Sequence, residues 1–254
     1  MARPNEARST GVTADLPIPE RAVAIGAHPD DVEFRCGATL AKWADSGCVV
    51  SYLICTDGSL GTWDADAHLA ELVAQRQAEQ RAAAKTLGAT GDMVFLGWTD
   101  GELASGLDQR RQVASWIRRL RPDVVLGHDP WKRYRLHPDH RHAGFLAVDG
   151  VAWAREPHAL PELDVPAHRP SSVLLFEAEE PDHVEVVDET HVARKLDALE
   201  THRSQFRSTM HIDDGPEHES QLEAFRTRVR ARLRDEAAMV GASWGEAFKL
   251  LSEV

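Results

Sequence analysis

Short apolar runs alternate along the first half of the chain with longer segments of helical character. Runs rich in Val, Ile and Leu predict buried strands over residues 21–27, 49–56, 93–97 and 123–128, because each is brief and ends at a loop signal. Helices are predicted between them, in a stretch around Leu40 that stops near Gly47, from about Leu69 to Leu87 and from Gln109 to Leu120. Strands that alternate with helices predict a mostly parallel sheet with right-handed crossovers.

The pattern changes at both ends of the chain. Residues 1–20 are polar, contain Pro and show no period, so we expect a flexible N-terminal arm there. Four prolines between residues 157 and 170 mark a loop, and strand-like segments over 172–177 and 184–188 and helices over about 192–206 and 221–238 follow it. We therefore expect a single α/β domain over residues 21–254 with a Rossmann-like three-layer core. Residues 156–254 would form its C-terminal β and helical extension.

Composition narrows the class of protein. The 254 residues carry 29 Lys and Arg against 41 Asp and Glu, a formal net charge of −12, which argues against binding to nucleic acid. No run approaches the ~18 apolar residues of a membrane span, so we expect no integral membrane segment and a cytoplasmic location. The 3 cysteines contain no CxxC pair and suit reduced thiols.

Histidine and aspartate gather after two of the predicted strands. The first strand ends at His-Pro-Asp-Asp over residues 28–31, and the fourth ends at His128 and leads to His-Pro-Asp-His over residues 137–140. Ligands of open α/β sheets bind at the carboxyl ends of the strands, where these segments converge. His and Asp suit a divalent metal such as Zn²⁺, which in hydrolytic sites typically takes three protein ligands and leaves a position for water.

The spacing divides the roles within this cluster. Adjacent Asp30 and Asp31 cannot point the same way, so one can bind metal with His28 while the other faces the metal-bound water as a general base. His140, close to the start of a helix, is well placed as a third ligand, and His137 can reach the same site as a hydrogen-bond donor or acid. The following helix favours Asp139 as an N-cap or as the partner of a ligating His. His128 either lines the pocket or closes its strand. The acidic cluster 177–180 is expected as a solvated edge.

These motifs resemble the PIG-L / LmbE-like family of zinc-dependent de-N-acetylases, which includes the N-acetylglucosaminyl-phosphatidylinositol deacetylases and the deacetylases of the mycothiol and bacillithiol pathways. The resemblance is carried by Ala27-His-Pro-Asp-Asp-Val-Glu33 with Gly37, followed much later by His137-Pro-Asp-His140, and it runs over most of residues 21–250. Weaker landmarks are Arg76, Glu79, Leu96-Gly97, Asp100-Gly101, residues 122–125, residues 202–205 and residues 246–248.

The resemblance implies a role for individual residues. It implies His28, Asp31 and His140 as zinc ligands, Asp30 as general base, His137 as oxyanion stabiliser or acid, and Arg76 and Asp100 as contacts to the substrate sugar. Fe²⁺, Co²⁺ or Ni²⁺ could occupy the same ligands. One position departs from the mycothiol branch, since Arg135, with Tyr134 beside it, stands where those relatives have a tyrosine.

The function implied is a hydrolase that removes an acetyl or other acyl group from an N-acyl amino sugar or glycoconjugate, by attack of a zinc-bound water on the amide. One alternative is a metal-dependent phosphoesterase, for which Lys132, Arg133 and Arg135 would supply phosphate contacts. Another is a non-catalytic sugar-binding member of the same fold. Relatives form homo-oligomers, which makes such assembly an expectation by analogy only.

Overall fold

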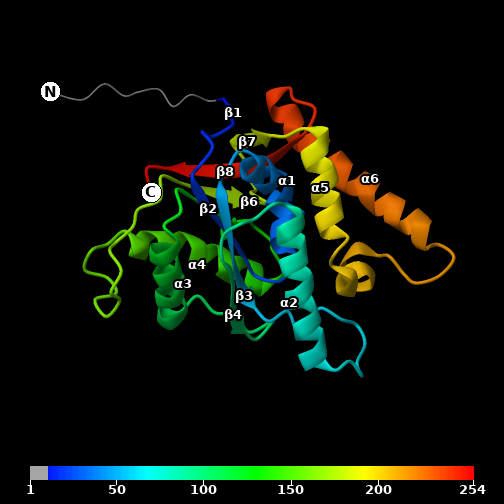
Figure 1. Cartoon of the computed structure of the whole chain (residues 1–254), viewed down its shortest axis with the longest axis horizontal. Coiled ribbons are helices and arrows are strands. Elements are labelled where there is room, and N and C mark those ends of the chain that lie inside the picture. Colours follow the sequence, from blue (N-terminus) through cyan, green and yellow to red (C-terminus); the bar gives the residue numbers. More distant parts are fainter. Residues whose placement is uncertain (1–10) are drawn as a thin grey trace.

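One mixed sheet runs through the molecule, with helices on both of its faces (Figure 1). The computed structural model describes residues 11–254. The strands are β1 (Thr13–Ala14), β2 (Arg21–Gly26), β3 (Val49–Thr56), β4 (Met93–Trp98), β5 (Val124–His128), β6 (Ser172–Phe176), β7 (His183–Val186) and β8 (Gly245–Ser252). The α-helices are α1 (Asp31–Asp45), α2 (Leu69–Thr86), α3 (Leu107–Leu120), α4 (Pro138–Ala154), α5 (Glu189–Leu199) and α6 (His218–Ala237).

The strand order is β1-β7-β8-β6-β5-β2-β3-β4. Strands β6, β5, β2, β3 and β4 pair in parallel, which confirms the mostly parallel sheet predicted from the sequence. Strand β8 lies between β6 and β7 and is antiparallel to both, and the sequence pattern did not predict it. Only its first half is fully buried, so it lacks the continuous apolar run of the central strands.

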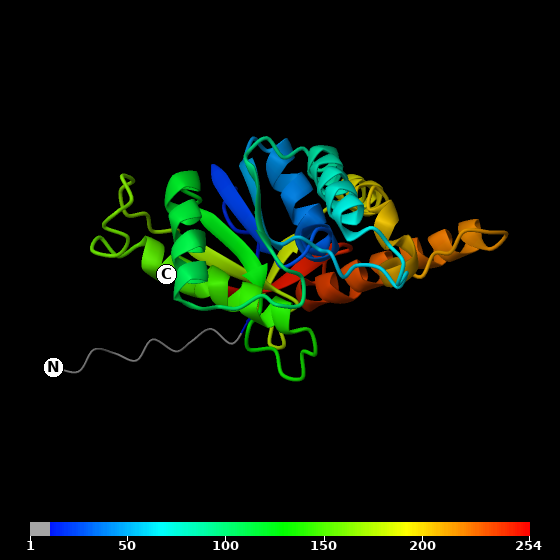
Figure 2. The ribbon, with the colours of Figure 1, turned by 90° about the horizontal axis from the view of Figure 1, so that it is seen from below.

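Two helical layers enclose the sheet. Helices α3 and α4 cover one face, where Val113, Ile117 and Leu146 belong to one apolar core. Helix α1 covers the other face, where Leu40 and Trp43 pack with apolar side chains of the strands. Helices α5 and α2 lie beside it on one side, and α5 contacts both α1 and α2 (Figure 2). The three-layer core is therefore confirmed, and it leaves the carboxyl ends of β2 and β5 free to form a site.

Two segments differ from the sequence predictions. Of the arm expected over residues 1–20, residues 1–10 lie outside the described part of the chain, whereas Thr13–Ala14 form a strand paired with β7, and Asp15 accepts a hydrogen bond from the Val186 amide. The helix expected over 192–206 ends at Leu199, and short 3₁₀ and π-helical turns follow it, η1 (Arg203–Gln205) and η2 (Phe206–Met210). A capping box at Asp188 starts α5 earlier than expected.

Helix α1 begins at the last residue of the first metal-site motif. It has an irregular residue near its middle, and a side chain of β8 binds the backbone just after this point. Its backbone leaves the helical region at Cys36, with φ −137° and ψ 18°. The amides of Ala38 and Thr39 donate to the Glu246 carboxylate at 3.2 and 2.7 Å. Lys195 of α5 lies 2.5 Å from the same carboxylate. The unpredicted strand therefore caps the second half of the helix that leads out of the site.

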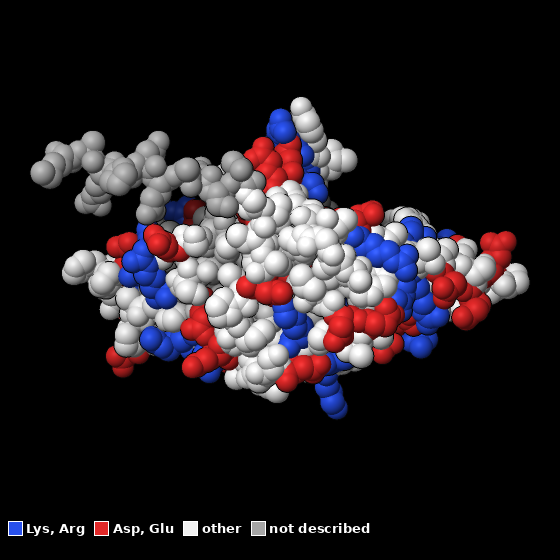
Figure 3. Space-filling view, turned by 90° about the horizontal axis from the view of Figure 1, so that it is seen from above, with Lys and Arg blue, Asp and Glu red and all other residues white. Residues whose placement is uncertain are grey.

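On one face of the molecule, charges of both signs lie next to one another. The face in Figure 3 shows Lys and Arg side chains next to Asp and Glu around a broad uncharged centre. Over residues 11–254, no helix combines the length and the apolar character that a membrane crossing requires.

Candidate active site

A cleft of about 450 Å³ opens at the carboxyl end of β2. All of the site residues predicted from the sequence line it: His28, Asp30, Asp31, Arg76, Asp100, His137 and His140. Phe34, Arg35, Leu60, Gly61, Gln205 and Thr209 complete its wall. Its volume and its position at the strand ends are typical of small-molecule sites in α/β proteins.

Three of these residues form a compact set of metal-ligand atoms. His28 follows β2, Asp31 begins α1, and His140 lies in the first turn of α4, which starts at Pro138. Nδ1 of His28 lies 3.4 Å from Oδ2 of Asp31, and Nε2 of His140 lies 3.2 Å from Oδ1 of Asp31. One ligand atom from each residue lies within 4.8 Å of the others. Two imidazole nitrogens and a carboxylate oxygen at this separation fit Zn²⁺ or a similar divalent metal.

Asp139 orients the first of these histidines. Its buried carboxylate lies 3.2 Å from Nε2 of His28 and accepts the Gly101 amide at 2.7 Å. When Nε2 carries the proton, the lone pair of Nδ1 is free, on the side of Asp31, to bind a metal. The N-cap of α4 is His137, and no side chain makes a capping hydrogen bond there. Of the two roles expected for Asp139, the structure therefore supports that of a partner of a ligating His.

His128 and Glu177 support the site from behind. His128 is fully buried at the end of β5 and is not among the residues that line the cleft, so it closes its strand. Its Nε2 lies 3.2 Å from Oδ2 of Asp31. The expectation of a solvated edge at Glu177 is wrong, because this side chain lies between Arg35 and Arg135, 2.8 Å from each. It follows β6, the neighbour of β5, so the sheet brings it to His128. Burial alone would raise the pKa of Glu177, but the contacts with His128, Arg35 and Arg135 outweigh this effect and lower the pKa.

Arg135 and Tyr134, the position that departs from the mycothiol branch, have different environments. Nη1 of Arg135 contacts Glu177 and also lies 2.9 Å from Nδ1 of His128. Tyr134 is 93% exposed. The arginine is thus part of the support of the metal-ligand set, and the tyrosine lies on the surface of the loop before His137.

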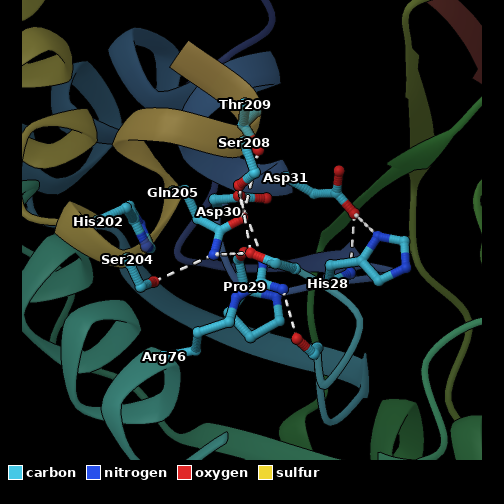
Figure 4. A network of polar contacts seen from close by, with 12 residues as sticks. His28, Pro29, Asp30, Asp31, Arg76, His202, Ser204, Gln205, Ser208 and Thr209 are labelled. Atoms are coloured by element: carbon cyan, nitrogen blue, oxygen red, sulfur yellow. Dashed lines mark hydrogen bonds and ion pairs between the residues drawn. The ribbon is translucent and has the colours of Figure 1, made fainter. Parts of the chain in front are cut away.

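Asp30 takes a different direction from Asp31, as the sequence predicts. Figure 4 shows the Asp31 carboxylate beside the His28 ring and Asp30 on the side of Arg76 and Gln205. Oδ2 of Asp30 lies 3.3 Å from Nη2 of Arg76. Burial raises the pKa of Asp30, and the Arg76 charge only partly offsets this effect. A buried carboxylate with a raised pKa is suited to accept a proton.

His137 lies at the open side of the cleft. Its ring centroid is 4.6 Å from that of His28 and 4.8 Å from that of His140. Partial burial and the neighbouring imidazoles lower the pKa of His137. Its exposed ring can therefore reach a bound substrate next to the metal-ligand atoms.

Arg76 and Asp100, predicted to contact sugar, also tie the walls of the cleft together. Nη1 of Arg76 donates to the Gly58 carbonyl and Nη2 to the Pro29 carbonyl, both at 2.6 Å. Asp100 accepts the Leu60 amide at 3.1 Å and lies 3.0 Å from Nε2 of His28. Their position in the cleft is confirmed, and the sugar contacts stay predictions.

A group of buried polar residues was not predicted from the sequence. Gln80, Glu33 and His202 lie behind Asp30, and each is fully buried. The sequence gives little indication that these three residues belong to the site. Gln80 lies on a polar helix, and Glu33 and His202 stand out only as parts of the family-like motifs. Only the packing of α1, α2 and the segment after α5 brings them together.

Comparisons with known proteins agree with this geometry. The family model described as GlcNAc-PI de-N-acetylase (PIG-L) matches residues 23–151. Diacetylchitobiose deacetylase of Thermococcus kodakarensis is 37% identical over 193 residues, which cover 74% of this chain and 70% of that enzyme. The 1D-myo-inositol 2-acetamido-2-deoxy-alpha-D-glucopyranoside deacetylase of Streptomyces avermitilis is 35% identical over 177 residues, 60% of this chain and 59% of that enzyme.

Solved structures share the whole fold. N,N'-diacetylchitobiose deacetylase from Pyrococcus horikoshii, complexed with its inhibitor MPG, superposes with a TM-score of 0.80 at 30% identity, over 92% of this chain and 84% of that one. The 4-carboxy-2-hydroxymuconate hydratase GalB of Pseudomonas putida superposes with a TM-score of 0.73 at 23% identity, which shows a common fold alone. From the family match and the identity to the Thermococcus enzyme, the chain belongs to the PIG-L family of de-N-acetylases.

Proposed function

We propose that the chain is a metal-dependent hydrolase that removes the acetyl group from an N-acetylglucosamine-type amino sugar or glycoconjugate. The observation that carries this proposal is the presence of Asp30 beside a complete set of ligand atoms from His28, Asp31 and His140 in one cleft. A protein that only bound metal would not need this further carboxylate. Relatives named as deacetylases of diacetylchitobiose and of an acetamido-glucopyranoside support the substrate class.

The residues divide the work of amide hydrolysis. His28, Asp31 and His140 would hold the metal, with Zn²⁺ as the preferred ion, and a bound metal would supply Lewis-acid polarisation and a more acidic water. Asp30 accepts a proton from the attacking water, and its raised pKa suits that transfer. His137 donates a hydrogen bond to the developing oxyanion, a contribution of roughly 3–4 kcal/mol for a well-placed donor. The C–N bond then breaks, the proton that Asp30 took from the water passes to the leaving amine, and acetate leaves.

The phosphoesterase alternative has less support from the geometry. Two of its three expected phosphate contacts are engaged elsewhere, since the guanidinium of Arg135 pairs with Glu177 and that of Arg133 donates to Glu179. The non-catalytic alternative would be favoured by loss of a ligand or of the base, and this chain keeps them all in the cleft.

The test is release of primary amine from N-acetylglucosamine and N,N'-diacetylchitobiose by the purified, zinc-loaded protein, with p-nitrophenyl phosphate as the phosphoesterase substrate. We expect amine release that a chelator abolishes and zinc restores. Asp30→Asn should lower kcat by about 10²–10⁴-fold, the usual contribution of a general base. Asp108→Asn, a matched change at an exposed carboxylate of α3, should have no effect. Full activity of Asp30→Asn, or phosphate release without amine release, would contradict the proposal.

A further inference from the structure

A row of buried polar side chains lies behind Asp30 and takes no part in the hydrolytic scheme. Gln80 comes from α2, Glu33 from α1 and His202 from the loop after α5, and each has 0% exposure. Buried polar groups that are not fully paired are costly, so such a row calls for an explanation beyond packing. It ends at the backbone of Asp30.

The backbone of Asp30 has an unusual conformation. Its φ is 107° and its ψ −29°, a left-handed region that residues with a side chain rarely adopt, so the surroundings must hold it there. The Asp30 amide donates to Oε1 of Gln80 at 2.8 Å. At the other end of the same peptide group, Nη2 of Arg76 donates to the Pro29 carbonyl at 2.6 Å. Side chains of α2 therefore hold both polar groups of the peptide bond that precedes the Cα of Asp30.

The direction of the Gln80 amide is set by Glu33. Nε2 of Gln80 donates to Oε1 of Glu33 at 2.8 Å, so the carboxylate oxygen faces the NH₂ end of the Gln80 amide. The amide oxygen of Gln80 is thereby turned toward the Asp30 N–H, since a flipped amide would place two donors against each other. His202 lies on the far side, with Nε2 3.4 Å from Oε2 of Glu33.

This arrangement separates the two adjacent carboxylates. Asp31 is fixed by its contacts to His140 and His128 and by the start of α1. The left-handed conformation of Asp30 directs its own carboxylate to another wall of the cleft, beside Arg76. If residue 30 relaxed into an ordinary conformation, its carboxylate would move relative to the metal-ligand atoms.

We propose that Gln80 is a positioning residue of the hydrolase: its amide oxygen holds Asp30 in the left-handed conformation, and Glu33, with His202 beside it, keeps that amide in the required orientation. This inference rests on the proposed function only for its catalytic consequence. The hold on the Asp30 backbone is a property of the fold and can be measured without substrate.

The test replaces Gln80 by Met, which has a similar length and neither accepts the Asp30 N–H nor donates to Glu33. We expect kcat to fall by about 10²-fold, the scale of a misplaced catalytic group, with KM and bound zinc unchanged. Gln75→Met is the matched control, because Gln75 is exposed on the same helix and its side-chain amide donates to the nearby Glu79. In the Asp30→Asn background, Gln80→Met should cause no further loss of kcat.

A second measurement is independent of activity. In an NMR hydrogen-exchange experiment, the Asp30 amide should be protected in the wild type and in Gln75→Met and should exchange rapidly in Gln80→Met. If Gln80→Met does not fold, Glu33→Gln is the second variant. It replaces the carboxylate by an amide that can present either an acceptor or a donor to Gln80, so it should show a smaller change of the same kind. Unchanged protection and kcat in the folded variants, or an equal loss of kcat in the Asp30→Asn background, would overturn the inference. If the wild type releases no amine while the Asp30 amide loses protection in Gln80→Met, the proposed function fails and the backbone role stands.

Discussion

Replacing Glu246 by Gln should destabilise the protein strongly although the change is isosteric. Glu246 is 1% and Lys195 is 3% exposed, and their charged atoms lie 2.5 Å apart. The variant leaves the buried Lys195 ammonium without a counter-charge, and breaking a buried pair in this way costs about 3–5 kcal/mol. That is a large part of the roughly 5–15 kcal/mol that stabilises a domain, and it corresponds to a Tm lower by about 6–20 °C for a chain of this size.

Urea denaturation and differential scanning calorimetry measure this loss. Glu219→Gln is the matched control, since Glu219 is highly exposed and its contact with Arg226 is 3.9 Å, so its effect should stay within about 0.5 kcal/mol. The double variant Lys195→Met/Glu246→Gln removes both charges and should recover part of the stability lost in Glu246→Gln. A free energy of unfolding for Glu246→Gln close to that of the wild type, or a double variant that loses the sum of the two single effects, would refute the reasoning.

Two further outcomes follow from groups outside the reaction scheme. His128→Gln should weaken zinc binding by about 10–100-fold in a calorimetric titration, because His128 orients Asp31 through a contact of 3.2 Å; an unchanged affinity would show that Asp31 is held without it. The free thiols Cys36, Cys48 and Cys55 are all buried, and burial raises the pKa of each, that of Cys48 to about 11. A thiol reagent at pH 8 should therefore label the denatured protein at each cysteine and the native protein at none, and rapid labelling of the native chain would show that these side chains are accessible.

Much of the fold and of the candidate site can be predicted from the sequence, because the patterns that indicate them lie within short stretches of the chain. Each β-strand of the parallel core is a short apolar run that ends at a turn, so the run, its boundary and its place in the β/α alternation are all visible in sequence. The two motifs at residues 28–31 and 137–140 stand at strand ends, and parallel topology alone brings such ends to one edge. The ligand set of His28, Asp31 and His140 follows from these two facts together with the family resemblance.

The features that the sequence concealed depend on pairings between distant segments. Strand β8 is antiparallel, half-exposed and inserted between β6 and β7, so its own residues carry no clear strand pattern, and its role as the cap of α1 requires knowledge of where Glu246 lies. Glu177 belongs to an acidic run that resembles a solvated edge until the β5–β6 pairing places it against His128. Gln80 is one polar residue among many on α2, and only the packing of that helix brings its amide to Asp30. Local periodicity records which face of an element is buried, whereas the partner of a buried polar group is set by tertiary packing.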